Sequence, residues 1–132
     1  QEDGSLQQLT TGSDNYFNPN MSPDGTKVAY QGLVGGVYIK DLNTGEVYNL
    51  GQGTNPVWLP DSSGILYAYS EDDGYNLTAG EIYYASADGA SNHDVTGTPD
   101  TIEQNPSLSP DGTQILWNDE NGNVYVGDLS DF

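Results

Sequence analysis

The chain has 132 residues, of which 34% are apolar or aromatic, and 20 acidic side chains against two lysines give a formal net charge of −18. Such a composition meets the criterion for intrinsic disorder, and two cations cannot neutralise a run of phosphates, which excludes nucleic acid and anionic membranes as partners. No apolar run approaches the roughly 20 residues of a membrane span, and no cysteine is present to form a disulfide or a thiolate metal site.

The chain starts at Gln1 and no leader-like segment follows. This start indicates either a mature chain after removal of an export signal or a fragment of a longer protein. The acid-rich composition without arginine suits a salt-rich or calcium-rich setting. We therefore expect an extracellular, cell-surface or periplasmic location.

In chain order, a short strand is expected at Leu6–Thr10, and a repeat follows it. The three copies of the repeat begin at Asn18, Asn55 and Asn105. Each copy continues with a proline-aspartate turn, then an element with tyrosine after an apolar residue. Fifteen residues separate Pro23 from Tyr38 in the first copy, and the third copy keeps this interval between its own turn proline and tyrosine. Fixed-period similarity of this kind indicates a repeat architecture, which overturns the expectation of disorder.

Each copy divides into short β-branched or aromatic segments bounded by Gly, Pro, Asn or Asp, a pattern typical of strands. Pro-Asp-Gly predicts a tight hairpin between the first two strands, and Asn121-Gly122 predicts another in the third copy. No stretch has the 3.6-residue period of a helix. Repeated short antiparallel strands predict an all-β fold of four-stranded β-propeller blades in one domain. The expected blades span residues 18–50 and 55–96, with a partial blade at 105–129.

The element Asn-Pro-x-x-Ser-Pro-Asp-Gly, followed by apolar-Tyr-x-x-Asp, resembles the repeat of TolB-like β-propellers, which are related to the WD-repeat class. The resemblance extends from about Leu6 to Leu129 and implies blades of a six-bladed ring. The second copy departs from it with Leu59-Pro60-Asp61-Ser62-Ser63-Gly64, which leaves the geometry of that turn open. The repeat does not imply one function, since it occurs in periplasmic binding proteins, in lyases and in peptidase propeller domains.

The strand count leaves the third copy incomplete. The interval from Tyr38 to Leu50 predicts its fourth strand beyond Phe132, while Leu6–Thr10 is a fourth strand with no blade before it. Three blades cannot close a ring that needs about four to eight. We therefore expect a homodimer of six blades in which the N-terminal strand of each protomer completes the third blade of its partner. The expected interface residues are Leu6, Gln7, Gln8, Leu9, Thr10, Val124, Tyr125, Val126, Asp128 and Leu129.

Two alternatives to the closed dimer stay open. A head-to-tail contact that does not close after two copies yields an extracellular filament. The 132 residues are otherwise a fragment of a larger propeller that binds carbohydrate or protein. Strand exchange would also protect an exposed edge strand, which is an aggregation hazard.

Two connections of the second copy are long. Eight extra residues lie within 70–80, and ten residues separate Val95 from Asn105, against five at the matching point of the first copy. Both connections are expected on one face of the propeller, and function is commonly carried by such loops. The expected ligand-binding residues are Tyr75, Asp100 and Glu103 on that face, with Asn18, Asn55 and Asn105 around the mouth of the central channel.

Acidic side chains in the longer connection provide the hard oxygen ligands that calcium prefers. Their order differs from the Asp-x-Asp-x-Asp-Gly loop, so calcium binding and plain solvation both stay open. The candidate ligands are Glu71, Asp72, Asp73 and Asn76. Asn76 also starts an Asn-x-Thr sequon and is the expected glycan site in a host that glycosylates.

No catalytic residue is expected. His93 is the only histidine, and no Gly-x-Ser-x-Gly element accompanies it. Without arginine, the chain could hardly clamp an anionic polysaccharide. We therefore expect a non-enzymatic scaffold that assembles with copies of itself and binds protein or carbohydrate.

Overall fold

A computed structural model describes residues 8–10, 14–34, 36–72, 74–75, 77–97 and 101–129, except for the side chains of residues 70, 72, 77 and 78. These residues form eleven strands in three antiparallel sheets. The described part of the chain contains no α-helix, and hence no helix long and apolar enough to cross a membrane. The expected all-β fold is confirmed.

The three sheets are called blade 1, blade 2 and blade 3. Blade 1 consists of β1 (Tyr16–Met21), β2 (Lys27–Gly32), β3 (Gly36–Asp41) and β4 (Val47–Gly51). Blade 2 consists of β5 (Thr54–Trp58), β6 (Gly64–Asp72), β7 (Leu77–Ser86) and β8 (Asn92–Asp94). Blade 3 consists of β9 (Glu103–Leu108), β10 (Gln114–Asp119) and β11 (Val124–Asp128). Strands pair in chain order within each blade, as hairpins require.

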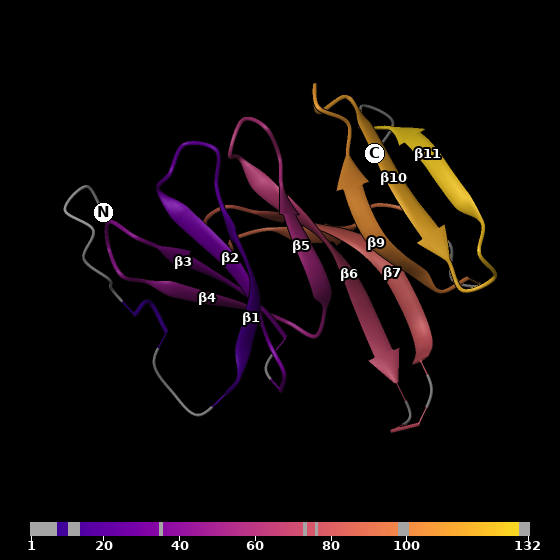
Figure 1. Cartoon of the computed structure of the whole chain (residues 1–132), viewed down its shortest axis with the longest axis horizontal. Coiled ribbons are helices and arrows are strands. Elements are labelled where there is room, and N and C mark those ends of the chain that lie inside the picture. Colours follow the sequence, from indigo (N-terminus) through magenta and orange to yellow (C-terminus); the bar gives the residue numbers. More distant parts are fainter. Residues whose placement is uncertain are drawn as a thin grey trace.

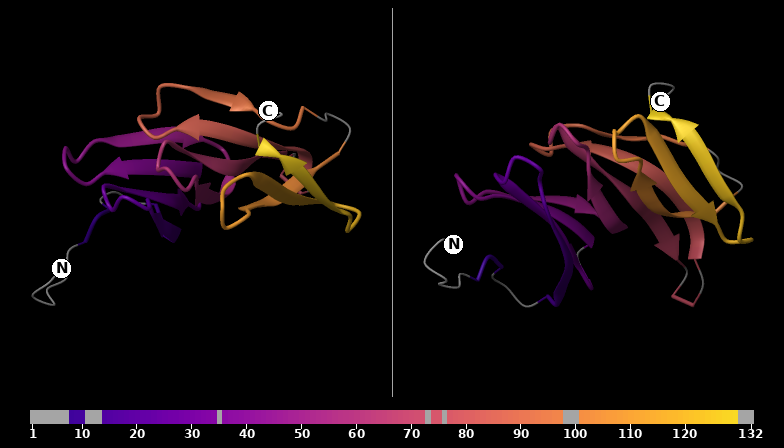
Figure 2. Two further views of the ribbon diagram at one scale, coloured as in Figure 1. Left: turned by 90° about the horizontal axis from the view of Figure 1, so that it is seen from above. Right: turned by 45° about the horizontal axis from the view of Figure 1, so that its top comes forward.

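Figures 1 and 2 show the blades side by side in chain order, from indigo to yellow. Strand β1 contacts β5, and β5 contacts β9, so the first strands of successive blades are neighbours. Strand β11 lies at the opposite end of this row from β3 and β4 (Figure 1).

Each blade begins on an irregular strand. The register between first and second strands shifts between Phe17 and Asn20 in blade 1, and similarly in the other blades. The irregularity falls on an Asn-Pro pair, where proline has no N–H to donate to the ladder. The preceding asparagines have left-handed backbones, with φ of 51° at Asn18, 55° at Asn55 and 56° at Asn105. Asparagine tolerates this conformation better than most residues, which explains its use at all three positions.

The proline-aspartate turns require a left-handed residue two positions after the proline. Gly25 has φ of 74° and Gly112 has φ of 73°. In the second copy, Ser62 takes the same conformation with φ of 63°, which settles the geometry that the sequence left open. The Ser62 hydroxyl also accepts a hydrogen bond of 3.0 Å from the backbone N–H of Asp24, so this turn touches the neighbouring blade.

The sequence suggested that the eight extra residues of the second copy form a long loop, but they do not. They lengthen the hairpin instead, with ladder pairs running from Gly64 with Ser86 to Asp72 with Leu77. The physical reason is that continued pairing satisfies the backbone N–H and C=O groups of both strands.

Two apolar clusters hold the blades together. Between blades 1 and 2, Ala29, Val37, Ile39, Ile65, Tyr67 and Ala85 are buried. Between blades 2 and 3, Leu66, Ala68, Ile82 and Ile115 are buried. Alternate residues of a strand point to opposite faces, so Ile65 faces blade 1 while Leu66 faces blade 3. Each blade therefore presents one face to its predecessor and the other to its successor.

Candidate functional site

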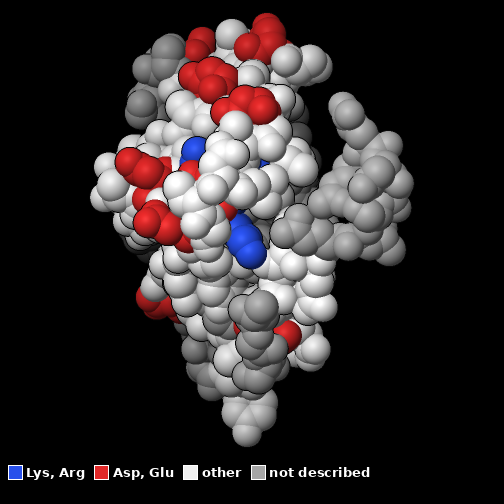
Figure 3. Space-filling view, turned by 90° about the vertical axis from the view of Figure 1, so that its left-hand side faces the viewer, with Lys and Arg blue, Asp and Glu red and all other residues white. Residues whose placement is uncertain are grey.

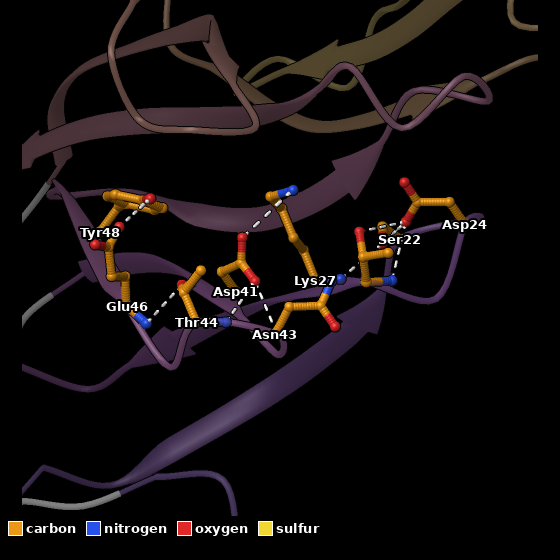
Figure 4. A network of polar contacts seen from close by, with 9 residues as sticks. Ser22, Asp24, Lys27, Asp41, Asn43, Thr44, Glu46 and Tyr48 are labelled. Atoms are coloured by element: carbon orange, nitrogen blue, oxygen red, sulfur yellow. Dashed lines mark hydrogen bonds and ion pairs between the residues drawn. The ribbon is translucent and has the colours of Figure 1, made fainter.

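The carboxylates of the proline-aspartate turns accept hydrogen bonds from residues of the same turn. Asp24 accepts hydrogen bonds from the Ser22 hydroxyl at 2.7 Å, from the Thr26 N–H at 2.9 Å and from the Thr26 hydroxyl at 2.7 Å (Figure 4). The Ser22 hydroxyl, followed by the Thr26 groups, lowers the pKa of Asp24 to about 2. Because hydrogen bonds to the charged form stabilise it, these carboxylates stay ionised and cap the backbone. Asp111 repeats the arrangement in blade 3, with its pKa also lowered to about 2.

Asp119 organises the hairpin between β10 and β11. Its carboxylate accepts hydrogen bonds from the backbone N–H groups of Asn121 and Asn123, from the Asn123 amide and from the Tyr125 hydroxyl. The Asn123 side chain is the largest of the causes that lower the pKa of Asp119 to about 2. Asp119 is 3% exposed. The turn therefore accounts for an aspartate-asparagine pair whose spacing looks like that of a metal site.

A chain of carboxamides runs along the first strands. The Asn55 amide donates to the Asn105 side-chain oxygen at 2.7 Å, and the Asn105 amide donates to Asn118 at 2.9 Å. In blade 1, the Asn18 amide donates to Gln31 at 3.1 Å, and the Gln31 oxygen also accepts from the backbone N–H of Asn55 at 3.2 Å. Gln31 thus links Asn18 to Asn55 across the boundary between blades 1 and 2, and Asn55 bonds directly to Asn105 of blade 3. The sequence reasoning missed Gln31 and Asn118.

A signal for Gln31 and Asn118 was present in the sequence. Gln31 and Asn118 occupy the same position of the repeat, eight residues after the turn proline. Each is a polar residue at the end of an otherwise apolar second strand, and this pattern could have indicated a hydrogen-bonding role. The asparagines of blades 1 and 2 also line an open hollow of about 410 Å³ with Pro19, Asn20, Pro56 and Val57. Whether this hollow takes a ligand stays a prediction.

The long connections of blade 2 carry several of the other expected site residues. Tyr75 is 95% exposed. Glu71 lies in β6 and accepts a hydrogen bond of 2.9 Å from the Tyr69 hydroxyl. Asp73, Asn76 and Asp100, together with the side chain of Asp72, lie outside the described residues, so the calcium and glycan expectations stay predictions. Among the residues that the structure describes, no group of three or more His, Asp or Glu side chains could hold a metal ion.

Glu103 does not lie on an exposed loop face, contrary to expectation. It is the first residue of β9, is 3% exposed, and accepts a hydrogen bond from the Thr96 hydroxyl. The preceding residue, Ile102, forms a bridge with Gly80 of β7. This bridge draws the start of β9 against blade 2, so the Glu103 side chain is not available to a ligand on that face.

The expected acceptor strand, β11, carries exposed apolar side chains. Val124 is 72% exposed, Tyr125 40% and Val126 61%. The Tyr125 ring stacks on Trp117 of β10 with centroids 5.7 Å apart. Within the described residues, β11 pairs with β10 alone and so forms the edge of blade 3.

The described part of the expected N-terminal strand, 8–10, lies against blade 1; Leu6 and Gln7 lie outside the described residues. Leu9 and Thr10 line a hollow of about 210 Å³ together with Tyr16, Phe17, Pro19, Val28 and Tyr30. The Lys40 ammonium donates a hydrogen bond to the Leu9 carbonyl. Figure 3 shows lysine side chains among acidic groups on the side of the molecule that carries blade 1.

Sheets that pack face to face in chain order, with their first strands adjacent, are blades of a β-propeller. No protein-family model matches the chain. The TolB homolog of Chlorobium luteolum is 29% identical over 135 residues, which span 96% of this chain and 29% of that protein. The three repeats resemble those of TolB-like β-propellers, as the sequence indicated.

Solved structures show the same fold. A structure assigned to TolB from Agrobacterium tumefaciens is 19% identical with a TM-score of 0.60, covering 89% of this chain and 50% of that one. The β-propeller domain of the Trilobed protease from Pyrococcus furiosus, which has an open velcro topology, is 16% identical with a TM-score of 0.68, covering 89% and 40%. The chain therefore spans from less than a third to half of the length of these proteins.

Proposed function

We propose that the chain is a non-enzymatic propeller module that assembles head to tail with copies of itself by strand complementation, and that it serves as a structural and binding scaffold outside the cytoplasm. In this assembly, residues 6–10 of one copy form the fourth strand of blade 3 in the next copy. The observation that carries the proposal is the position of Leu9 against blade 1.

Leu9 occupies the same place relative to blade 1 that the fourth strands occupy relative to the blades that follow them. Leu50 at the end of β4 packs against the cluster that contains Ile65 and Tyr67 of blade 2. Val95, after β8, packs against the cluster that contains Ile115 of blade 3. The repeat aligns Leu9 with both residues. The described N-terminal segment thus lies where the fourth strand of a blade before blade 1 would lie. The other strands of such a blade are not among the described residues.

The acceptor for this segment is the outer edge of β11, which pairs with β10 alone among the described strands. An unpaired strand edge presents N–H and C=O groups that another strand can satisfy. Residues 8–10 and β11 lie at opposite ends of the row of blades (Figure 1), so the two cannot pair within one molecule. Pairing between molecules is the arrangement that satisfies both.

Two copies supply six blades, and a closed six-bladed dimer is the favoured assembly. A filament results if the rotation between copies does not close after two. In the remaining alternative, the chain is a part of a longer propeller, in keeping with the small share of its relatives that it covers. Each assembly would line its axis with the linked asparagines, whose uncharged carboxamides suit a carbohydrate hydroxyl or a peptide backbone.

Deletion of residues 1–10 tests the proposal. We expect the full chain to sediment as a dimer or larger species and the shortened chain as a folded monomer, with its sheet content checked by circular dichroism. A synthetic peptide of residues 1–13 should then bind the shortened chain and slow amide hydrogen exchange over 124–128, whereas a scrambled peptide should not. Assembly that persists after the deletion, or a peptide that leaves β11 unprotected, would show that strand complementation is wrong.

A further inference from the structure

The row of blades has two outer faces, and both expose apolar side chains at positions that are covered inside the row. The leading face belongs to blade 1 and points away from blade 2. The trailing face belongs to blade 3 and points away from blade 2 on the other side. The repeat allows each outer residue to be compared with its covered counterparts.

On the trailing face, Val124 and Val126 correspond to Val37 and Ile39 of blade 1. The two residues of blade 1 are 0% exposed because blade 2 covers them, whereas Val124 is 72% exposed and Val126 is 61% exposed. The trailing face therefore has the aliphatic character of an interior blade surface without a covering blade among the described residues.

On the leading face, Met21 corresponds to Trp58 of blade 2 and Leu108 of blade 3. Trp58 packs against the cluster between blades 1 and 2, and Leu108 packs against the cluster between blades 2 and 3. Met21 is 57% exposed. Its position is therefore the counterpart of the residue that each later blade presses onto its predecessor.

We propose that the trailing face of one copy docks on the leading face of a second copy, so that Val124 and Val126 of one molecule pack near Met21 of the next. This deepens the proposed function: strand complementation joins backbones at the edge of blade 3, whereas this contact joins side chains across the blade faces. Continuity with the interior interfaces identifies the occupant, since β3 of blade 1 contacts β5 of blade 2. By the same stacking, β11 of one copy contacts β1 of the next.

Charge does not drive this pairing, because both blades are acidic. Residues 14–51, which include blade 1, carry four carboxylates and both lysines, whereas residues 101–129 carry five carboxylates and no cation. The contact therefore joins the only blade with cations to a blade that has none. Each whole copy still carries a formal charge of −18, so association should strengthen as salt screens the repulsion.

Charge insertion on each face tests the contact. Met21→Lys and Val126→Glu should each weaken self-association at least tenfold in sedimentation equilibrium, because each buries an unpaired charge at every copy-to-copy contact. A mixture of the two variants should associate again. In the mixture, one contact pairs two native faces, and in the other the introduced lysine of M21K meets the introduced glutamate of V126E.

Two matched controls put the same charges on exposed apolar residues away from both faces. Leu33→Lys, at a residue 68% exposed in the turn between β2 and β3, and Tyr75→Glu, at a residue 95% exposed between β6 and β7 of the middle blade, should leave association unchanged. A native chain that stays monomeric, or a mixture of M21K and V126E that does not recover, overturns the docking. If removal of residues 1–10 dissociates the protein while M21K and V126E do not, strand complementation stands and face docking fails.

Discussion

Val37 and Val124 occupy one position of the repeat but differ in burial, so alanine at each position isolates the effect of a covering blade. Val37 is 0% exposed and belongs to the cluster between blades 1 and 2, whereas Val124 is 72% exposed. The same two methyl groups are removed in both variants. The difference between the variants therefore measures what blade-to-blade packing contributes at this position.

The expected cost at Val37 follows from its burial. Two methyl groups at about 0.8 kcal/mol each give about 1.6 kcal/mol of lost transfer free energy. The cavity left behind adds to this, so Val37→Ala should lower the free energy of unfolding by about 2 kcal/mol. At Val124, the side chain is mostly in water before the substitution, so Val124→Ala should cost less than about 0.5 kcal/mol.

Urea denaturation followed by circular dichroism at 25 °C, at a protein concentration low enough to keep the chain dissociated, gives both values. A chain of this size should also lose roughly 8 °C in Tm for Val37→Ala, at about 4 °C for each kcal/mol. Equal destabilisation by the two variants under these conditions would refute the assignment of Val124 to an uncovered face. It would mean that β11 already packs against part of its own molecule.

Two further predictions concern the turns. Gly25→Ala places a side chain on a backbone with φ of 74° and meets no atom within 4 Å, so it should lower the free energy of unfolding by about 1 kcal/mol in urea denaturation. Gly112→Ala should lower it by more, because its Cβ would overlap the Pro60 ring. Equal losses would contradict the close approach of Gly112 to Pro60. In the folded chain, the Asn123 side chain is the main cause that lowers the pKa of Asp119 from 3.8 to about 2. The stabilising effect of the ionised Asp119 carboxylate is therefore fully present above about pH 4 and is lost as the pH falls toward 2. An NMR titration of the Asp119 carboxyl should find the low value, and a midpoint near 3.8 would contradict the hydrogen bonds to that carboxylate.

Much of the blade architecture could be predicted because its signals are local. The proline-aspartate turns fix where hairpins reverse, and the Asn-Pro pairs mark where each first strand becomes irregular. The turn chemistry even tolerates Ser62 in place of glycine, which the sequence could not settle because a left-handed serine depends on its neighbours. One of these neighbours is Asp24, in another blade.

The length of the hairpin between β6 and β7 and the burial of Glu103 were not predictable in this way. Acidic residues and glycine between two strands suggested a loop, yet cross-strand pairing carries both strands to Asp72 and Leu77. Glu103 follows a long connection and looks like a loop residue, yet the bridge between Gly80 and Ile102 brings it against blade 2. In both cases, contacts between segments distant in the sequence decide the outcome.

The sequence by itself thus determined the repeat, the strands and their turns, because these depend on backbone preferences within a few residues. Only the tertiary structure decided which equivalent residues are covered, since Val37 and Val124 are identical in sequence but differ in what packs on them. It also decided where Leu9 lies, against the leading face of blade 1. Burial depends on whether another blade is present at that face, and a local pattern does not encode that neighbour.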